Sequence, residues 1–127
     1  MYKETAICLV IIIFVITLEV ITQNYTKQSI EDLSSKLDEL KKEINEDELD
    51  KLENSIKYIK EDLESRYSKL AFYINHEDIE KFGVEIAEIQ SDIEIEEYKR
   101  SIEKIDLCIY MLKNIQDKNS MKLVNIF

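Results

Sequence analysis

The chain opens on an almost unbroken apolar run. Residues 6–21 read AICLVIIIFVITLEVI, interrupted only by Thr17 and Glu19. As a helix this run would be roughly 24 Å long, slightly shorter than the hydrocarbon core of a bilayer. Tyr2 and Tyr25, about 35 Å apart on a straight helix, would lie in the two interfacial belts. The run predicts a transmembrane anchor whose apolar side chains are Ala6, Ile7, Leu9, Val10, Ile11, Ile12, Ile13, Phe14, Val15, Ile16 and Leu18.

Two other interpretations of this run compete with an anchor. A cleaved signal peptide needs small residues after its apolar region, and the following sequence, EVITQNYTK from Glu19, lacks such a pair. A buried core helix of a soluble domain is disfavoured by the length and continuity of the run. We therefore expect an uncleaved signal anchor over residues 1–25. Lys3 and the terminal amine are offset by Glu4, so the expectation of an extracytoplasmic position for the remainder rests mainly on the short segment before the run.

Beyond Tyr25 the apolar residues recur at alternating steps of three and four, which places them on helical stripes. Four stripes predict an all-α domain over residues 26–127, built as about four helices in two antiparallel hairpins. An extended coiled coil that continues from the membrane helix, formed by a dimer, is the alternative shape. The stripes are Ile30, Leu33, Leu37, Leu40, Ile44; Leu49, Leu52, Ile56, Ile59, Leu63, Tyr67, Leu70; Ile79, Phe82, Ile86, Ile89, Ile93; and Ile95 or Tyr98, Ile102, Ile105, Ile109, Leu112.

Polar segments separate the stripes and predict the helix boundaries. Asp47 is the expected N-cap of the second helix, and residues 75–78 supply caps for the third. Residues 91–97 form the weakest break, so residues 77–116 are either two helices or one bent helix. Residues 116–120 are expected to end the last helix.

The two halves of the domain share a layout. A shift of 49 residues overlays Ile30 on Ile79 and Ile44 on Ile93. A duplicated helical hairpin would produce this match. So would any two heptad stretches, because they overlay at multiples of seven.

An apolar segment, residues 121–127, ends the chain. It is either a strap packed along the bundle or a segment that docks on a partner or on the membrane face. In the docking interpretation the contact residues are Leu123, Val124, Ile126 and Phe127.

Composition narrows the class of function. Proline is absent and Gly83 is the only glycine, which favours helices over tight hairpins. The net charge of −10 disfavours nucleic-acid binding, because that affinity comes from Lys and Arg neutralising phosphates.

Residues with reactive side chains are scattered. His76 is the only histidine, and Glu80 stands where a zinc helix needs a second one, so His76 is interpreted as a turn residue at a helix start. The acidic clusters 46–48 and 94–97 lack the spacing of a calcium loop and are interpreted as solvated acids at helix starts. Cys8 and Cys108 are placed too far apart for a disulfide. We expect no catalytic residue, cofactor or metal. The tyrosines at the stripe edges are expected to border the core: Tyr58, Tyr67, Tyr73, Tyr98 and Tyr110.

The order of these elements resembles a family of domain-of-unknown-function proteins from Gram-positive, spore-forming bacteria. The likeness rests on the apolar N-terminus, the acidic paired helices, the turn FYINHEDI from Phe72 and the ending Asn125-Ile126-Phe127. Members of that family often carry a tryptophan in the second helix, where this chain has only Tyr67 or Phe72. The resemblance implies a location and a fold but no chemistry.

Together these observations predict a non-enzymatic envelope protein held in the membrane by its N-terminal helix. Its bundle would bind another membrane or exported protein, through an exposed stripe or the C-terminal segment, and self-association is also open. The alternative is a sensor-like, ligand-binding bundle that acts through a membrane partner.

Overall fold

The computed structural model describes residues 2–126, with side chains described as far as Met121. The helices are α1 (Tyr2–Asn45), α2 (Leu52–Tyr73), α3 (His76–Glu94) and α4 (Tyr98–Ile126), with a short 3-10 turn, η1 (Leu49–Lys51), before α2. The described residues contain no strand. The all-α class, the long apolar N-terminal helix and the four-helix bundle are confirmed.

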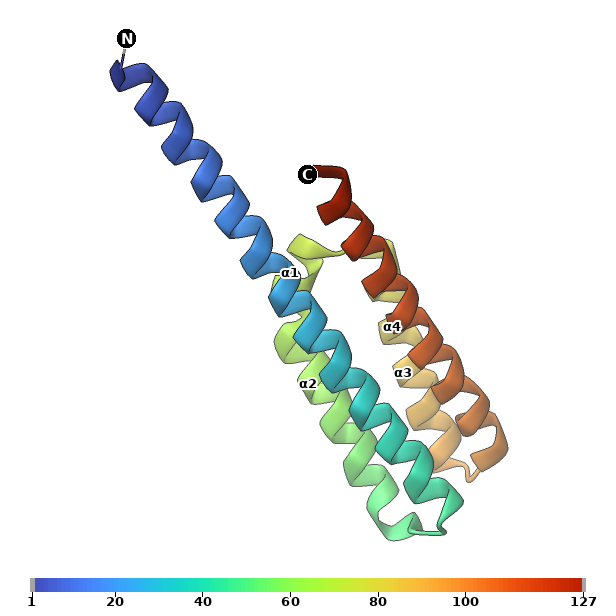
Figure 1. Ribbon diagram of the computed structural model, residues 1–127. Coiled ribbons are helices and arrows are strands. Elements are labelled where there is room, and N and C mark those ends of the chain that lie inside the picture. The colour runs from blue at the N-terminus through green and yellow to red at the C-terminus, as the bar shows by residue number, and fades with distance from the viewer. Residues whose placement is uncertain (1, 127) are drawn as a thin grey trace.

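The second half of α1 and the three other helices form an antiparallel bundle (Figure 1). Each helix packs against two others, because α1 contacts α2 and α4, and α3 contacts the same two. Short connections make consecutive helices antiparallel neighbours. The first half of α1 projects alone beyond the bundle (Figure 1).

Most of the core comes from the predicted stripes, but the stripe residue Leu49 is 39% exposed, and the core also includes Cys108 and Ile115, which belong to no predicted stripe. Leu37, Ile86, Ile89 and Ile105 are fully shielded from solvent, and each buried aliphatic side chain contributes roughly 1.5–3 kcal/mol relative to exposure. Ile95 lies exposed in the turn between α3 and α4, whereas Tyr98 is half-buried against the core. The core residues are Ile30, Leu33, Leu37, Leu40, Ile44, Leu52, Ile56, Ile59, Leu63, Phe82, Ile86, Ile89, Ile93, Ile105, Cys108, Leu112 and Ile115.

Helices α1 and α3 end in the same kind of turn. Asp47 and Glu96 adopt left-handed backbone conformations, with φ of 57° and 62°. The following amide donates to a carbonyl five residues earlier in each case, Glu48 to Glu43 at 2.9 Å and Glu97 to Asp92 at 2.8 Å. This is the Schellman arrangement that satisfies the last carbonyls of a helix. The prediction of Asp47 as an N-cap was therefore wrong: Asp47 reverses the chain after α1, and Lys51 precedes α2 without a side-chain cap.

Of the remaining boundaries, one prediction is confirmed, one open alternative is decided and one prediction is corrected. Asn75 caps α3, since its Oδ1 accepts a 3.0 Å hydrogen bond from the amide of Glu77. The turn at residues 95–97 separates α3 from α4, so the single bent helix is excluded. Helix α4 does not end at residues 116–120 but runs to Ile126. Its polar residues are accommodated within the packed helix, where Asn119 is buried against α1.

Helix α1 passes through Tyr25 without interruption. The apolar run and the first bundle helix are therefore one continuous rod. Burial on α1 begins at Gln23, and the apolar residues from Tyr2 to Ile21 are exposed.

Candidate functional site

The projecting half of α1 carries every predicted anchor residue. An 18-residue window in this helix has a mean hydropathy of 2.7 and is not buried by the rest of the chain. Among the described residues, α1 is the one helix with the length and composition to cross a membrane. The hydroxyls of Thr17 and Thr22 donate 2.8 Å hydrogen bonds to the carbonyls of Ile13 and Leu18. The helix thus satisfies these polar groups internally, as a lipid environment requires.

Where the apolar run ends, α1 and α4 meet in a layer of buried polar side chains. This polar layer consists of Gln23, Thr26, Ser29 and Asn119. Gln23 Nε2 donates a 2.7 Å hydrogen bond to the backbone carbonyl of Asn119. Thr26 Oγ1 and Asn119 Nδ2 are buried without a partner among the described protein atoms. The layer fixes which residues of α1 and α4 lie side by side.

Arg66 of α2 joins the polar layer to the apolar core. Its guanidinium donates to Ser29 Oγ at 3.0 Å, to Asp32 at 2.8 Å and to Asp62 at 3.1 Å. Partial burial alone would raise the pKa of Asp62, but hydrogen bonds from Lys36 and Arg66 outweigh it and lower that pKa. Partial burial alone would lower the pKa of Arg66. The hydrogen bonds that its guanidinium donates to Asp62 and Asp32 outweigh this effect and raise that pKa. The cluster therefore ties α1 to α2 with ionised partners.

Aromatic side chains gather at the end of the bundle nearest the projecting helix. The rings of Tyr25 and Tyr73 meet edge to face at 5.9 Å between centroids, and Lys69 Nζ lies 5.3 Å from the centre of the Tyr25 ring. Phe72, at the end of α2, is 88% exposed. His76 begins α3, as the sequence predicted, and its Nε2 lies 2.8 Å from a Glu80 carboxylate oxygen.

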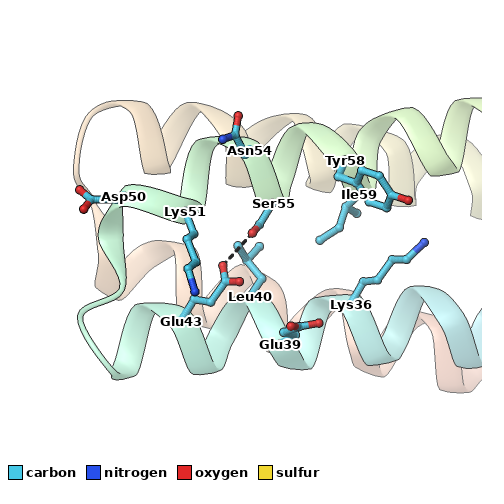
Figure 2. Close-up of a pocket in the computed structure, with 10 residues that line it drawn as sticks. All are labelled: Lys36, Glu39, Leu40, Glu43, Asp50, Lys51, Asn54, Ser55, Tyr58 and Ile59. Carbon is cyan, nitrogen blue, oxygen red and sulfur yellow. Dashed lines mark hydrogen bonds between the residues drawn. The ribbon is translucent and has the colours of Figure 1, made fainter.

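A surface groove lies between α1 and α2 near the other end of the bundle (Figure 2). The volume of this groove is about 360 Å³. Ser55 Oγ donates a 2.8 Å hydrogen bond to Glu43, and Lys36 Nζ lies 5.2 Å from the Tyr58 ring centre. Tyr58 is 64% exposed. The groove is lined by Lys36, Glu39, Leu40, Glu43, Asp50, Lys51, Asn54, Ser55, Tyr58 and Ile59.

Two of the tyrosines expected at the core edge are instead exposed. Tyr58 and Tyr110 are each more than half exposed, whereas Tyr67, Tyr73 and Tyr98 are half-buried. The exposure of Tyr58 could have been predicted from the sequence. Tyr58 falls between the stripe positions Ile56 and Ile59, and neighbouring positions on a helix point in different directions, so its side chain does not share the buried face.

Helices α3 and α4 are joined by a second charged cluster. Lys104 Nζ lies 2.9 Å from buried Asp92 and 3.3 Å from Glu88. The hydrogen bond to Asp92 raises the pKa of Lys104, and the bond to Glu88 adds to this effect. Partial burial, together with the negative charge of Glu88, raises the pKa of Glu85. These charges hold the two helices together at the surface of the core.

Cys108 is a core residue of α4 and is fully shielded from solvent. Burial raises the pKa of its thiol to about 12, with the negative charges of Glu85 and Glu88 adding to the rise. A thiol in this state is packed and unreactive. Cys8 lies on the projecting half of α1.

The remaining candidates occupy the two ends of the bundle. The acidic clusters 46–48 and 94–97 are exposed, as the sequence predicted, and they lie in the turns that lead into η1 and α4: Glu48 directly precedes η1, and the Glu97 carbonyl accepts a 3.0 Å hydrogen bond from the Ser101 amide. Within the described residues no group of three His, Cys, Asp or Glu side chains is arranged to hold a metal ion. Leu123, Val124 and Ile126 belong to the last turns of α4, beyond the described side chains, and Phe127 lies outside the described residues.

Residues 20–126 match the model of a family described as a domain of unknown function, DUF4363. The matched range begins close to Gln23, where burial starts, and ends with α4. Comparisons with curated proteins and with solved structures find no match.

Proposed function

Because the chain belongs to the DUF4363 family of domains of unknown function, we propose its role from the structure. The protein is a non-enzymatic, membrane-anchored module that presents an acidic helical bundle to a partner protein. The anchor is a single-pass span over residues 1–25, and the bundle comprises residues 26–127. The bundle lies on the extracytoplasmic side, an orientation that Lys3 before the apolar run favours.

The continuity of α1 is the observation that carries this proposal. A helix that emerges from a membrane and enters the bundle core without a break leaves no flexible linker between them. From Gln23 to Asn45 the helix extends roughly 34 Å. The end of the bundle opposite the apolar run is therefore held at a fixed distance from the bilayer. A partner protein that binds there would meet the bundle at that distance from the membrane.

The contacts of the reactive side chains support a non-enzymatic role. Cys108 is packed in the core with a pKa near 12. Asp92 and Lys104 form an ion pair that joins α3 to α4. Arg66 makes the corresponding link between α1 and α2. All of these reactive side chains are therefore engaged in core packing or in contacts between helices.

Charge distribution indicates the class of partner. Arg66 marks a level that divides the bundle into a proximal half, residues 26–30, 66–84 and 112–126, and a distal half, residues 31–65 and 85–111. The proximal half has seven basic and four acidic residues, a net charge of +3. The distal half has nine basic and twenty-one acidic residues, a net charge of −12. A partner with a basic segment would be attracted to the distal half.

The groove between α1 and α2 gives this partner a defined place to bind. It lies within the distal half and combines the exposed ring of Tyr58 with the carboxylates of Glu39 and Glu43 (Figure 2). Tyrosine is enriched in protein interfaces because it offers a large, rigid surface with a polar end. A basic side chain of the partner would meet the carboxylates while its aliphatic portion packs on the ring.

Site-specific photo-crosslinking in intact cells tests this proposal. A photoreactive residue at position 58 should capture the same partner protein repeatedly, and the double change Glu39→Lys and Glu43→Lys should abolish the product. A photoreactive residue at exposed Val84 of α3 is the matched control. Products that contain only this chain would show self-association instead, and they would overturn the proposal of a different partner.

Protease shaving of intact cells tests the orientation. With a tag after Phe127, an extracytoplasmic bundle loses the tag on protease treatment. A tag that is protected in intact cells and lost in lysed cells would place the bundle in the cytoplasm.

A sensor-like function is the second candidate, and the polar layer favours it. Thr26 Oγ1, Gln116 Oε1 and Asn119 Nδ2 are buried without protein partners at the junction of span and bundle. A small polar ligand there would alter the packing of α1 on α4. Thr26→Val would then abolish the response of the partner while leaving partner capture at position 58 intact. If Thr26→Val abolished both the response of the partner and its capture at position 58, or abolished neither, the result would count against a sensor.

A further inference from the structure

The register between α1 and α4 brings the C-terminal turns beside the apolar run. The two helices are antiparallel, and Gln23 bonds to Asn119 (Figure 1). Helix α4 then continues from Asn119 to Ile126, a further rise of roughly 10 Å. In an antiparallel pair this stretch lies level with residues 16–22 of α1, the last turns of the run. The end of α4 therefore reaches the height of the proposed membrane surface.

The sequence of this stretch suits that position. Met121 is 64% exposed. The residues after it in the helix are Lys122, Leu123, Val124, Asn125 and Ile126. Apolar residues with one lysine are typical of segments that lie at a bilayer interface, since lysine extends its amine toward the headgroups.

The turn between α2 and α3 lies at the same end of the bundle (Figure 1). It presents Phe72, which at 88% is the most exposed large apolar residue among the bundle side chains that the structure describes. Beside it, Tyr73 packs against Tyr25 of α1, which places the turn next to the base of the span. Aromatic side chains are enriched at the level of the headgroups.

The proximal half of the bundle differs in net charge from the distal half. The proximal half is weakly basic in a strongly acidic chain, and it includes Lys27, Lys69 and Lys118. Anionic lipid attracts the proximal half and repels the distal half, over a range set by the Debye length of about 8 Å in physiological salt. The field of an anionic bilayer would thus hold the bundle upright on its proximal end.

We propose that the proximal end of the bundle is a second membrane-contacting surface. The turn at Phe72 and the last turns of α4 lie in the interfacial region of the bilayer that α1 spans. The occupant is lipid, because a surface level with the apolar run of a spanning helix faces the membrane. This inference rests on the proposed anchor, and it goes further by giving the bundle three points of contact that fix its tilt and rotation.

Tryptophan fluorescence in vesicles tests the contact directly, since the chain has no tryptophan of its own. The full chain is reconstituted in phosphatidylcholine–phosphatidylglycerol vesicles as a set of single-tryptophan variants. Phe72→Trp probes the proposed surface, and Leu49→Trp probes the distal end. Phe14→Trp probes the span. Each variant is measured with ordinary lipid and with lipid brominated near the headgroup or deeper in the acyl chain.

The expected result is that F72W emission shifts to shorter wavelength and is quenched most by the shallow bromines. F14W should be quenched by the deep bromines, and L49W by neither. Met121→Trp provides a second probe of the same surface and should behave as F72W does. If F14W is quenched while F72W and M121W match L49W, the anchor stands and this inference is overturned. If F14W also escapes quenching, the anchor itself fails.

Discussion

Gln23 and Asn119 are bonded across the two helices that meet at the base of the projecting segment. The Gln23 side-chain amide donates to the backbone carbonyl of Asn119 at 2.7 Å, inside a buried layer. This bond sets the register of α4 on α1. The position of the C-terminal turns relative to the apolar run, and hence to a membrane, follows from it.

Replacing Gln23 with alanine should destabilise the bundle by about 1 kcal/mol, the net contribution of one buried hydrogen bond. Urea unfolding of the full chain in detergent, followed by circular dichroism, measures the change. Gln28→Ala on the exposed face of α1 is the matched control and should have little effect. Equal stability of the two variants would show that the bond does not hold the register.

Replacing Arg66 with methionine should cost about 2 kcal/mol, within the range for hydrogen bonds to charged groups. The change removes the donors to Ser29, Asp32 and Asp62 but keeps much of the aliphatic length. The other arginine supplies the control, because Arg100 is largely exposed and lies 3.7 Å from Asp92. A smaller loss of stability for R66M than for R100M would contradict the role of Arg66 as a link between α1 and α2.

Asp62 should contribute stability that is lost in acid. Its pKa in the folded chain lies below the ordinary value of 3.8, so the unfolded chain binds more protons near that pH. The contribution is fully present above pH 3.8 and declines as the pH falls through the lowered pKa. Asp62→Asn should therefore be less stable than the native chain at neutral pH, with a difference that shrinks below pH 3.8. Thermal unfolding across this pH range measures the difference, with exposed Asp38→Asn as the matched control.

Glu85 should behave in the opposite sense. Partial burial and the neighbouring Glu88 raise its pKa above the ordinary 4.5, so its ionisation costs folding stability as the pH rises through that range. Glu85→Gln should stabilise the bundle at neutral pH by roughly 0.3 kcal/mol, the scale of a partly exposed charge pair. The gain should vanish below pH 4.5 in thermal unfolding. Exposed Glu61→Gln serves as the control, and a loss of stability in E85Q would refute the assignment.

The thiol of Cys108 should report opening of the core. In a Cys8→Ser chain, the remaining thiol is fully buried with a pKa near 12. Its reaction with a maleimide should be at least about a hundredfold slower in the folded chain than in urea, because it requires the bundle to open. Labelling at similar rates in both states would mean that α4 is not packed as described.

Hydrophobic periodicity was sufficient to predict the helical core. Leu33, Leu37 and Leu40, for example, recur at the spacing of one helical face, and all three are buried. The shift of 49 residues also acquires structural support, because the left-handed residues Asp47 and Glu96 differ by that interval. Heptad overlap alone does not require matching turns, so these turns favour two equivalent hairpins.

Positions decided by packing between distant segments could not be predicted. The polar residues of α4 near Asn119 resemble a helix end in sequence, but they are buried against Gln23 and Thr26 of α1. Asp47 has the composition of an N-cap, and only the geometry of the chain reversal assigns it to the end of α1. Local propensity does not distinguish these roles, because each depends on a partner far away in the sequence or on the path of the connection.

The proposed function depends most on α1 being an uncleaved span that continues into the bundle. Its most direct test is the intact mass of the chain in membranes washed with alkaline carbonate, after expression of residues 1–127. We predict a carbonate-resistant species near 15.1 kDa. A soluble chain shortened by the apolar run would identify a cleaved signal sequence, and a full-length soluble chain would show that α1 does not enter the membrane; either result would contradict the account.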